Sequence, residues 1–213
     1  MLPYYNQVEM LAGERVSKLF GGKTKYAMET SNQESFSYSE GGIKWLCYVD
    51  IFNQTDNNIN IIEVKATTSR KFLDMGVKKK KEMICPMFVI NKQGIYELNT
   101  NISDEILKPF NKVKAKLYER FDDVGKYVYD LAIQRHIITE ELKQTGRLED
   151  IKKLKFYLGV LNHEYIHDGS KHYPTDDNDG IITLIDMTNI TADLNDKILL
   201  EKAKIINYIS DNH

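Results

Sequence analysis

The alternation of hydrophobic and polar positions in the first third of the chain predicts one helix followed by three strands. The predicted elements are a helix from Asn6 to Phe20 and strands over 33–40, 44–51 and 59–66. Asn6 can cap the helix, Gly21-Gly22 ends it, and Gly41-Gly42 forms a hairpin turn between the first two strands. A polar loop over 53–58 separates the second and third strands.

The rest of the chain alternates between strand and helix patterns. The predicted elements are a strand over 95–98, helices from Ser103 to Phe121 and over 127–143, strands over 155–162 and 180–188, and a C-terminal helix over 191–213. The signal over residues 72–124 is less uniform, and we interpret this segment as an insertion. The order of elements predicts an α/β or α+β fold, with a mixed central sheet flanked by helices in a single domain over residues 1–213.

Composition describes an ordinary globular chain. Its 213 residues are 42% hydrophobic and 28% charged, and the net charge of −2 exerts no overall pull towards nucleic acid. The two cysteines, Cys47 and Cys85, are far apart in apolar surroundings, which favours free thiols in a reducing compartment. The N-terminus lacks a signal-peptide pattern, and no apolar run approaches ~18 residues. We therefore expect a cytoplasmic protein that does not span a membrane.

Candidate chemistry gathers in the hairpin between residues 44 and 66. Successive side chains of a strand alternate between its faces, so Glu63 and Lys65 share one face and Ile62 and Val64 point to the other. In the preceding strand, Trp45, Cys47, Val49 and Ile51 form an apolar face and Asp50 lies on the opposite one. If Phe52 pairs with Ile59, Asp50 lies diagonal to Glu63, at about 7–8 Å. A slip of one residue would turn Asp50 to the apolar side.

This set of side chains suits phosphate chemistry. Two carboxylates and a carbonyl oxygen are ligands that Mg²⁺ or Mn²⁺ accepts, and such an ion activates water and shields phosphate charge. A lysine beside them stabilises the charge that develops on phosphorus. The simpler alternative is a surface ion pair between Glu63 and Lys65, worth about 0–1 kcal/mol.

The same residues resemble a known family. The chain is similar to the RecB-like branch of the PD-(D/E)XK nuclease superfamily, and to a little-characterised bacterial group related to CRISPR-associated RecB-like exonucleases. The resemblance rests on Asp50, the stretch from Ile61 to Ser69, and a downstream helix with Asp130-Leu131-Ala132-Ile133-Gln134. Three further similar stretches are 13–22, 161–165 and 185–188.

The resemblance implies a restriction-endonuclease-like core and a role for each matched residue. Asp50, Glu63 and the carbonyl oxygen of Val64 would bind Mg²⁺ or Mn²⁺, Lys65 would be the catalytic lysine, and Gln134 would orient substrate or the attacking water. The chain departs from the family at Ser17, where relatives often carry a histidine, and at Ile138, where a tyrosine is usual. It also lacks the cysteines of an iron–sulfur cluster, and some relatives continue into a second nuclease-like domain or module.

The resulting prediction is a metal-dependent deoxyribonuclease with exonuclease-like action, with RNA left open as a substrate. The alternative is a catalytically inactive module that binds nucleic acid or protein. Two other motifs have competing interpretations. Glu14 is placed opposite the apolar stripe of the first helix, so a solvated side chain is favoured over a metal ligand. Lys78 to Lys81 form a run that is either solvated charge or a phosphate-gripping arm.

The stretch His163-Glu164-Tyr165-Ile166-His167 matches the zinc-peptidase motif HExxH. That chemistry requires a helix, which brings both histidines to one face. Here the motif follows a predicted strand and precedes an Asp168-Gly169 turn, so we expect no helix. In an extended chain the two histidines would be about 13 Å apart, too far for one zinc ion.

Overall fold

The computed structural model describes residues 3–27, 29–167, 169 and 180–211. The helices are α1 (Pro3–Phe20), α2 (Arg70–Leu73), α3 (Asp104–Lys114), α4 (Gly125–Gln144), α5 (Leu148–Ile151), α6 (Thr188–Asp193) and α7 (Asn195–Asp211), with 3-10 turns η1 (Thr30–Asn32) and η2 (Ala115–Tyr118). The strands are β1 (Lys23–Tyr26), β2 (Glu34–Glu40), β3 (Ile43–Val49), β4 (Ile51–Gln54), β5 (Ile59–Thr68), β6 (Gly76–Lys79), β7 (Glu82–Pro86), β8 (Phe88–Ile90), β9 (Ile95–Leu98), β10 (Leu154–Leu161) and β11 (Ile182–Asp186).

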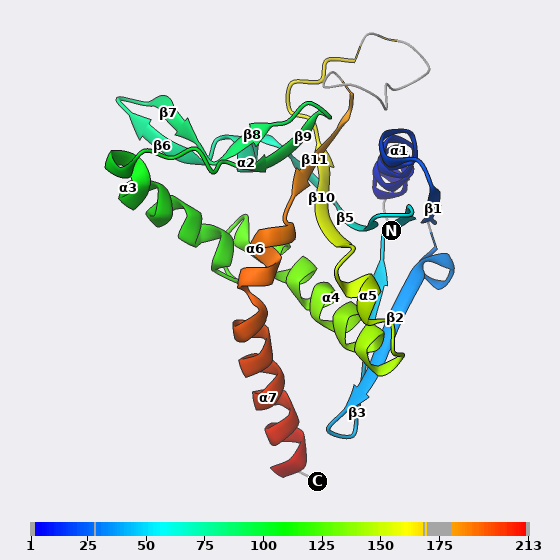
Figure 1. Cartoon of the computed structure of the whole chain (residues 1–213). Coiled ribbons are helices and arrows are strands. Elements are labelled where there is room, and N and C mark those ends of the chain that lie inside the picture. Colours follow the sequence, from blue (N-terminus) through cyan, green and yellow to red (C-terminus); the bar gives the residue numbers. More distant parts are fainter. Residues whose placement is uncertain (1–2, 28, 168, 170–179, 212–213) are drawn as a thin grey trace.

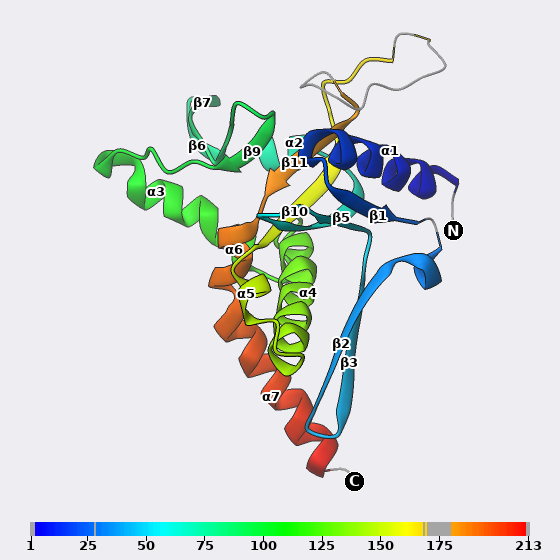
Figure 2. The same cartoon turned by 45° about the vertical axis from the view of Figure 1, so that its right-hand side comes forward.

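A seven-stranded sheet in the order β1-β4-β5-β10-β11-β9-β8 forms the centre of the molecule. β10 runs parallel to β5 and β11 runs parallel to β9, while the other neighbours are antiparallel. Figure 2 shows α1 on one side of the sheet and α4 on the other. The expected mixed α/β architecture with flanking helices is therefore confirmed.

Each face of the sheet has its own core. Ile62 and Val64 of β5 pack with Val8 and Val16 of α1 in the smaller cluster. Ile61, which is two residues before Glu63 and therefore shares its face of the strand, belongs to the larger cluster, which α4 covers through side chains such as Leu131. This split follows from strand alternation, and it means that Glu63 points towards α4.

The second predicted strand is not continuous. The chain bends at Asp50, where β3 ends and β4 begins, and the β2–β3 hairpin leaves the central sheet as a separate two-stranded arm. Figures 1 and 2 show this arm running beside α4, with its tip near the C-terminal part of α7, where Lys202 forms an ion pair with Glu40 of the arm at 2.6 Å. The prediction that Val49 and Ile51 share one apolar face is wrong. Val49 packs in the α4-side core and Ile51 in the α1-side core, because the bend breaks the alternation.

The register of β4 and β5 also differs from the prediction, by two residues. Phe52 pairs with Ile61 rather than Ile59, and Asn53 pairs with Asn60. The predicted polar loop is correspondingly shorter, because Asn53 lies within β4 and is fully buried. The Asn60 amide donates to the Asn53 side-chain oxygen at 2.8 Å, and the Asn53 amide donates to the carbonyl of Gly21 at 2.7 Å. This buried amide pair holds the register, since other pairings would leave it unsatisfied.

Several element boundaries differ from those expected. Asn6 lies inside α1, which begins at Pro3, a favoured residue in a first helical turn. The helix from Ser103 gives way to η2, so Phe121 lies beyond both and is 95% exposed instead of packing. The C-terminal helix begins earlier than Thr191 and is divided into α6 and α7 at buried Leu194.

Residues 72–124, interpreted as an insertion, fold together with the rest of the domain. β8 and β9 extend the central sheet beside β11, and buried Phe72, Met87 and Phe110 join the α4-side core. Both cysteines are free thiols, with Cys85 buried and Cys47 partly buried. Among the residues described above, no helix is long and apolar enough to cross a membrane.

Candidate functional site

The bend at Asp50 brings its carboxylate against β5. The backbone N–H of Val64 donates to Asp50 Oδ2 at 2.7 Å, in place of a ladder partner that the departing strand no longer supplies. Gln33 approaches the other carboxylate oxygen at 3.5 Å. Because Ile51 pairs with Ile62, the next position along the register sets Asp50 directly beside Glu63 rather than diagonal to it. The two residues are thus neighbours, through a different register from the predicted one, and the charge of Glu63 acts on Asp50. Their convergence on one ion stays a prediction.

Glu63 and Lys65 project from the same face of β5, as predicted. The Lys65 ammonium lies 2.7 Å from Glu63 Oε1 and 3.4 Å from the Asp130 carboxylate of α4. Glu63 is only 8% exposed, whereas the Lys65 side chain keeps 23% of its surface in contact with solvent. The Lys65 ammonium therefore lies between the buried carboxylate of Glu63 and the solvent.

Gln134 completes the set from α4. It lies three residues after Leu131 and four before Ile138, so it shares the buried face of the helix with them. Its amide donates to Glu63 Oε2 at 2.5 Å. Its own oxygen, Oε1, is buried and has no hydrogen-bond partner among the described residues. An amide acceptor left in this state is unfavourable in a finished core, which marks the position as a place for a further donor or ligand.

Burial and mutual repulsion shape the electrostatics of the site. Loss of solvent and the neighbouring charge of Glu63 raise the pKa of Asp50 to about 8, although the Val64 N–H opposes the shift. Burial lowers the pKa of Lys65, but the charges of Glu63, Asp130 and Asp50 and the hydrogen bond to Glu63 together outweigh it, so the pKa is raised. In the metal-free protein at neutral pH, Asp50 therefore stays protonated, and a bound cation would displace that proton.

Sequence analysis missed a third carboxylate near this pair, that of Glu9 on α1. Burial and the charge of Glu63 raise the pKa of Glu9, and its charge in turn acts on Asp50. Glu9 and Val16 are seven residues apart, which places them within about 20° of each other around the helix. This spacing from Val16, which is buried, predicts that Glu9 faces the sheet, and it could have identified Glu9 from the sequence. Glu14 is exposed, as expected for a solvated residue.

The residues of the site fit a hard divalent cation such as Mg²⁺ or Mn²⁺. Asp50 and Glu63 offer oxygen ligands whose repulsion a cation relieves, and the unpartnered Gln134 oxygen lies beside them. In the part of the chain that is described, no group of three or more His, Cys, Asp or Glu side chains is arranged to hold a metal ion. Two carboxylates are nevertheless sufficient for Mg²⁺, which usually keeps several waters. The role of the Val64 carbonyl stays a prediction.

The HExxH stretch forms no helix, as expected. His163 follows the end of β10, and the chain from there to His167 has turn and irregular structure. His163 Nδ1 lies 2.8 Å from the hydroxyl of Ser69, and the His163 N–H donates to the same oxygen at 3.1 Å. Ser69 is fully buried, so this pair ties the loop after β10 to the end of β5.

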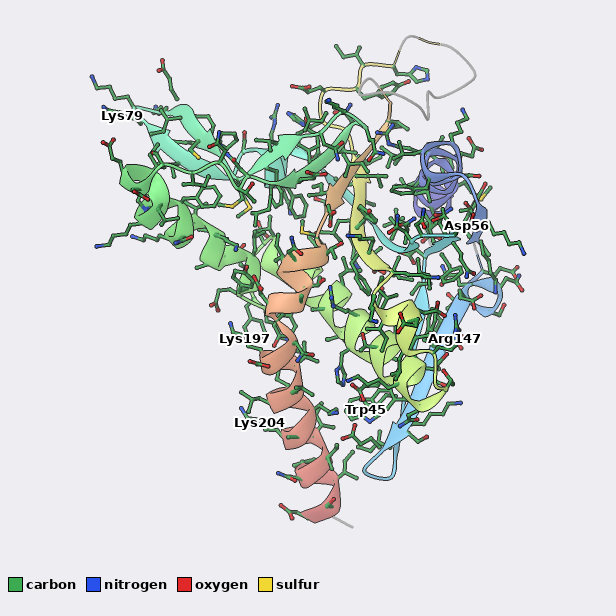
Figure 3. All side chains as sticks on the ribbon, in the orientation of Figure 1. Trp45, Asp56, Lys79, Arg147, Lys197 and Lys204 are labelled. Atoms are coloured by element: carbon green, nitrogen blue, oxygen red, sulfur yellow. The ribbon has the colours of Figure 1, made fainter. Side chains whose placement is uncertain are left out.

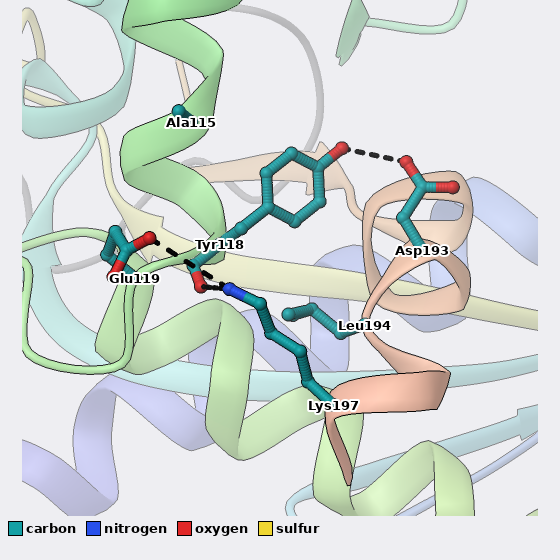
Figure 4. A pocket seen from close by; sticks show the side chains of 6 residues that line it. All are labelled: Ala115, Tyr118, Glu119, Asp193, Leu194 and Lys197. Carbon is teal, nitrogen blue, oxygen red and sulfur yellow. Dashed lines mark hydrogen bonds and ion pairs between the residues drawn. The ribbon is translucent and has the colours of Figure 1, made fainter. Parts of the chain in front are cut away.

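A pocket of about 470 Å³ lies elsewhere, between η2 and the α6–α7 junction. In Figure 4 the Tyr118 hydroxyl donates to Asp193, and Lys197 contacts the Tyr118 carbonyl oxygen and the Glu119 carboxylate. These contacts join the two segments across the pocket. It contains none of the predicted site residues, which are Asp50, Glu63, Val64, Lys65 and Gln134.

Comparison of the chain with protein-family models, with curated proteins and with solved structures finds no match.

Proposed function

We propose that this protein is a metal-dependent phosphodiesterase that hydrolyses nucleic acid, with DNA as the favoured substrate and exonuclease-like action. The proposal includes a restriction-endonuclease-like core of the RecB-like type. Its main support is the meeting of Asp50 and Glu63 at the bend, with the Lys65 ammonium 2.7 Å from Glu63. Four side chains, from the bend at Asp50, from β5 and from α4, thus lie close together at this position.

Each residue has a distinct task in such a reaction. Asp50 and Glu63 would hold Mg²⁺ or Mn²⁺, with the Val64 carbonyl as a further oxygen ligand. When bound, the ion supplies an activated water and positive charge at the phosphate. Lys65, at the solvent side of Glu63, stabilises negative charge on the phosphate oxygens as water attacks phosphorus and the ester bond breaks. Gln134 orients Glu63 through its amide and offers its free oxygen to the water.

Cleavage assays with paired variants test this proposal. Linear and circular DNA, single- and double-stranded, and a labelled RNA are incubated with Mg²⁺, Mn²⁺ or EDTA. We expect metal-dependent cleavage that falls at least about 100-fold in Glu63→Gln and in Lys65→Ala, since each removes a preorganised charge. Glu14→Gln is the matched control, because it makes the same chemical change on an exposed helix face. Cleavage that persists in both site variants would show that the activity comes from somewhere else.

One observation favours a second function, that of an inactive nuclease-fold module that binds nucleic acid or protein. Both carboxylate oxygens of Glu63 already have partners, Lys65 at one and Gln134 at the other. A closed network of this kind stabilises a fold without needing a cation. Retained binding of DNA with no cleavage in any metal would select this second function over the first.

A further inference from the structure

Charge is unevenly divided along this chain. Residues 70–116 contain 11 of the 29 lysines and arginines and only 5 of the 31 aspartates and glutamates, a net charge of +6. The remaining residues carry 18 basic and 26 acidic side chains, a net charge of −8. The overall value of −2 therefore hides a strongly basic part, which we call the basic lobe. It comprises α2, β6 to β9, α3 and the first two residues of η2, and it lies at one side of the molecule in Figure 1.

The tip of the β6–β7 hairpin is built around lysine. Lys79 pairs with Glu82, and the two residues between them, Lys80 and Lys81, have positive φ angles of 50° and 74°. Two central residues with positive φ characterise a type I′ turn, for which asparagine and glycine are the favoured residues. Lysine is strained in this conformation. Figure 3 shows Lys79 at the outer end of the hairpin, away from the sheet.

Most lysines of the basic lobe are free to meet a partner; Lys71 and Lys114 pair with Asp123 and Asp193, at 3.9 Å each. Within the described part of the chain, none of Lys78 to Lys81 takes part in an ion pair, and all four are exposed. α3 packs beside β6 and adds Lys108 and Lys112, with Lys116 following in η2. These three are exposed and spaced four residues apart, so they form a stripe along one side of the helix.

The basic surface continues to the candidate site through Tyr127 of α4. Three ammonium groups lie around its ring: Lys65 at 5.9 Å from the centroid, Lys71 at 5.9 Å and Lys126 at 5.1 Å. Phe72, next to Lys71 in α2, packs against the same ring at 6.4 Å. α2 is also the segment that joins β5 to β6. These three ammoniums have carboxylate partners, Glu63 and Asp130 for Lys65 and Asp123 for the other two. Tyr127 and α2 thus connect the candidate site to the basic lobe in space, while the unpaired positive charge lies on the hairpin and along α3.

We propose that the basic lobe binds the phosphodiester backbone of a nucleic acid strand, independently of sequence. The unpaired lysines of the β6–β7 hairpin, α3 and η2 suit a linear polyanion, because each ammonium can neutralise one phosphate and release its counterion. An aromatic ring among the ammoniums gives a base a surface for stacking. This inference goes beyond the proposed hydrolysis, since the binding requires neither a metal ion nor cleavage.

The turn itself provides a variant that removes charge without harming the fold. Lys80→Asn/Lys81→Gly deletes two positive charges and installs the residue pair that a type I′ turn prefers. Its melting temperature should therefore equal or exceed that of the wild type. Lys44→Asn/Lys204→Gln is the matched control: it makes the same change of net charge at two exposed lysines, one on β3 and one on α7. Lys204 is seen in Figure 3 on the opposite part of the molecule from Lys79.

Fluorescence anisotropy with labelled single- and double-stranded DNA, in EDTA and over a tenfold range of salt, tests the proposal. For Lys80→Asn/Lys81→Gly we expect binding weakened some tens of fold at about 0.1 M salt, and a log–log salt slope smaller by about 2. The control variant should keep the wild-type affinity and slope. Equal binding by wild type and turn variant would overturn the proposal. A second outcome would also overturn it: the wild type binds anionic phosphatidylserine vesicles but not DNA, and the turn variant loses the binding to vesicles.

The two proposals can fail separately. Binding is measured in EDTA, and the probe is checked for integrity afterwards on a denaturing gel. A turn variant with weakened binding, together with a wild type that never cleaves in Mg²⁺ or Mn²⁺, would refute the hydrolytic function alone. Normal binding by the turn variant in a protein that does cleave would refute the role of the basic lobe alone.

Discussion

Replacing Asp50 by asparagine should make the metal-free protein more stable, by an amount that grows with pH. The pKa of Asp50 is raised from 3.8 to about 8. Between these two values the folded protein holds a proton that the unfolded chain releases, so the stability of the wild type falls as pH rises through this window. Asparagine carries no charge at any pH, and its side-chain oxygen can still accept the Val64 N–H.

The magnitude follows from linkage. Each pH unit inside the window costs the wild type about 1.4 kcal/mol. The advantage of Asp50→Asn over the wild type should therefore increase by about 3 kcal/mol between roughly pH 5 and 7. Urea denaturation in EDTA at several pH values measures it, through the difference between the free energies of unfolding of the two proteins.

The control for this series is Asp56→Asn, which alters an exposed aspartate in the loop between β4 and β5. Its difference from the wild type should stay flat with pH. Saturating Mn²⁺ should narrow the difference between Asp50→Asn and the wild type, because an ion at 100 times its dissociation constant adds about 2.7 kcal/mol to the protein that binds it. If the difference in free energy of unfolding between Asp50→Asn and the wild type is constant from pH 5 to 7, the pKa of Asp50 is not raised by burial and by the charge of Glu63.

Two further predictions concern residues around the same hairpin. Asn60→Ala removes the donor to the buried Asn53 oxygen and should lower the free energy of unfolding by about 1–3 kcal/mol, measured in urea; an unchanged midpoint would mean that the amide pair contributes nothing. Gln134→Glu replaces an amide donor to Glu63 by a like charge. It should lower the melting temperature in EDTA at neutral pH and enlarge the rise caused by Mn²⁺, and a smaller rise than in the wild type would contradict the placement of a cation there.

Much of the hairpin could be predicted because alternation along a strand is a local property. The shared face of Glu63 and Lys65 follows from their spacing alone, and the same holds for the helix that bears Gln134, whose apolar residues recur every three or four positions. Long periodic segments such as α4 and β10 were found for this reason. Short elements such as α2 and β6 have too few residues to show a period.

What could not be predicted depends on tertiary contacts. The bend at Asp50 arises because β3 pairs with β2 and β4 pairs with β1 and β5, and such choices of partner leave no mark in the alternation of a single strand. Glu9 was missed because its importance comes from the approach of α1 to the hairpin, although its angle beside Val16 was available. The predicted position of Phe121 on the buried face of the helix was wrong, because helical spacing of an apolar residue does not show where the helix ends.

The buried pair of Asn53 and Asn60 has a consequence for how the chain finds its fold. A slip of two residues between β4 and β5 keeps every side chain on its own face, so hydrophobic burial cannot tell the two arrangements apart. The side-chain amides do distinguish the two arrangements, because in the slipped one Asn60 would face Ile51 and lose its hydrogen bond to Asn53. We expect a double leucine replacement to fold into two competing forms, only one of which brings Asp50 beside Glu63. The two asparagines thus disfavour the slipped register during folding. They contribute more to the uniqueness of the native structure than to its free energy of unfolding.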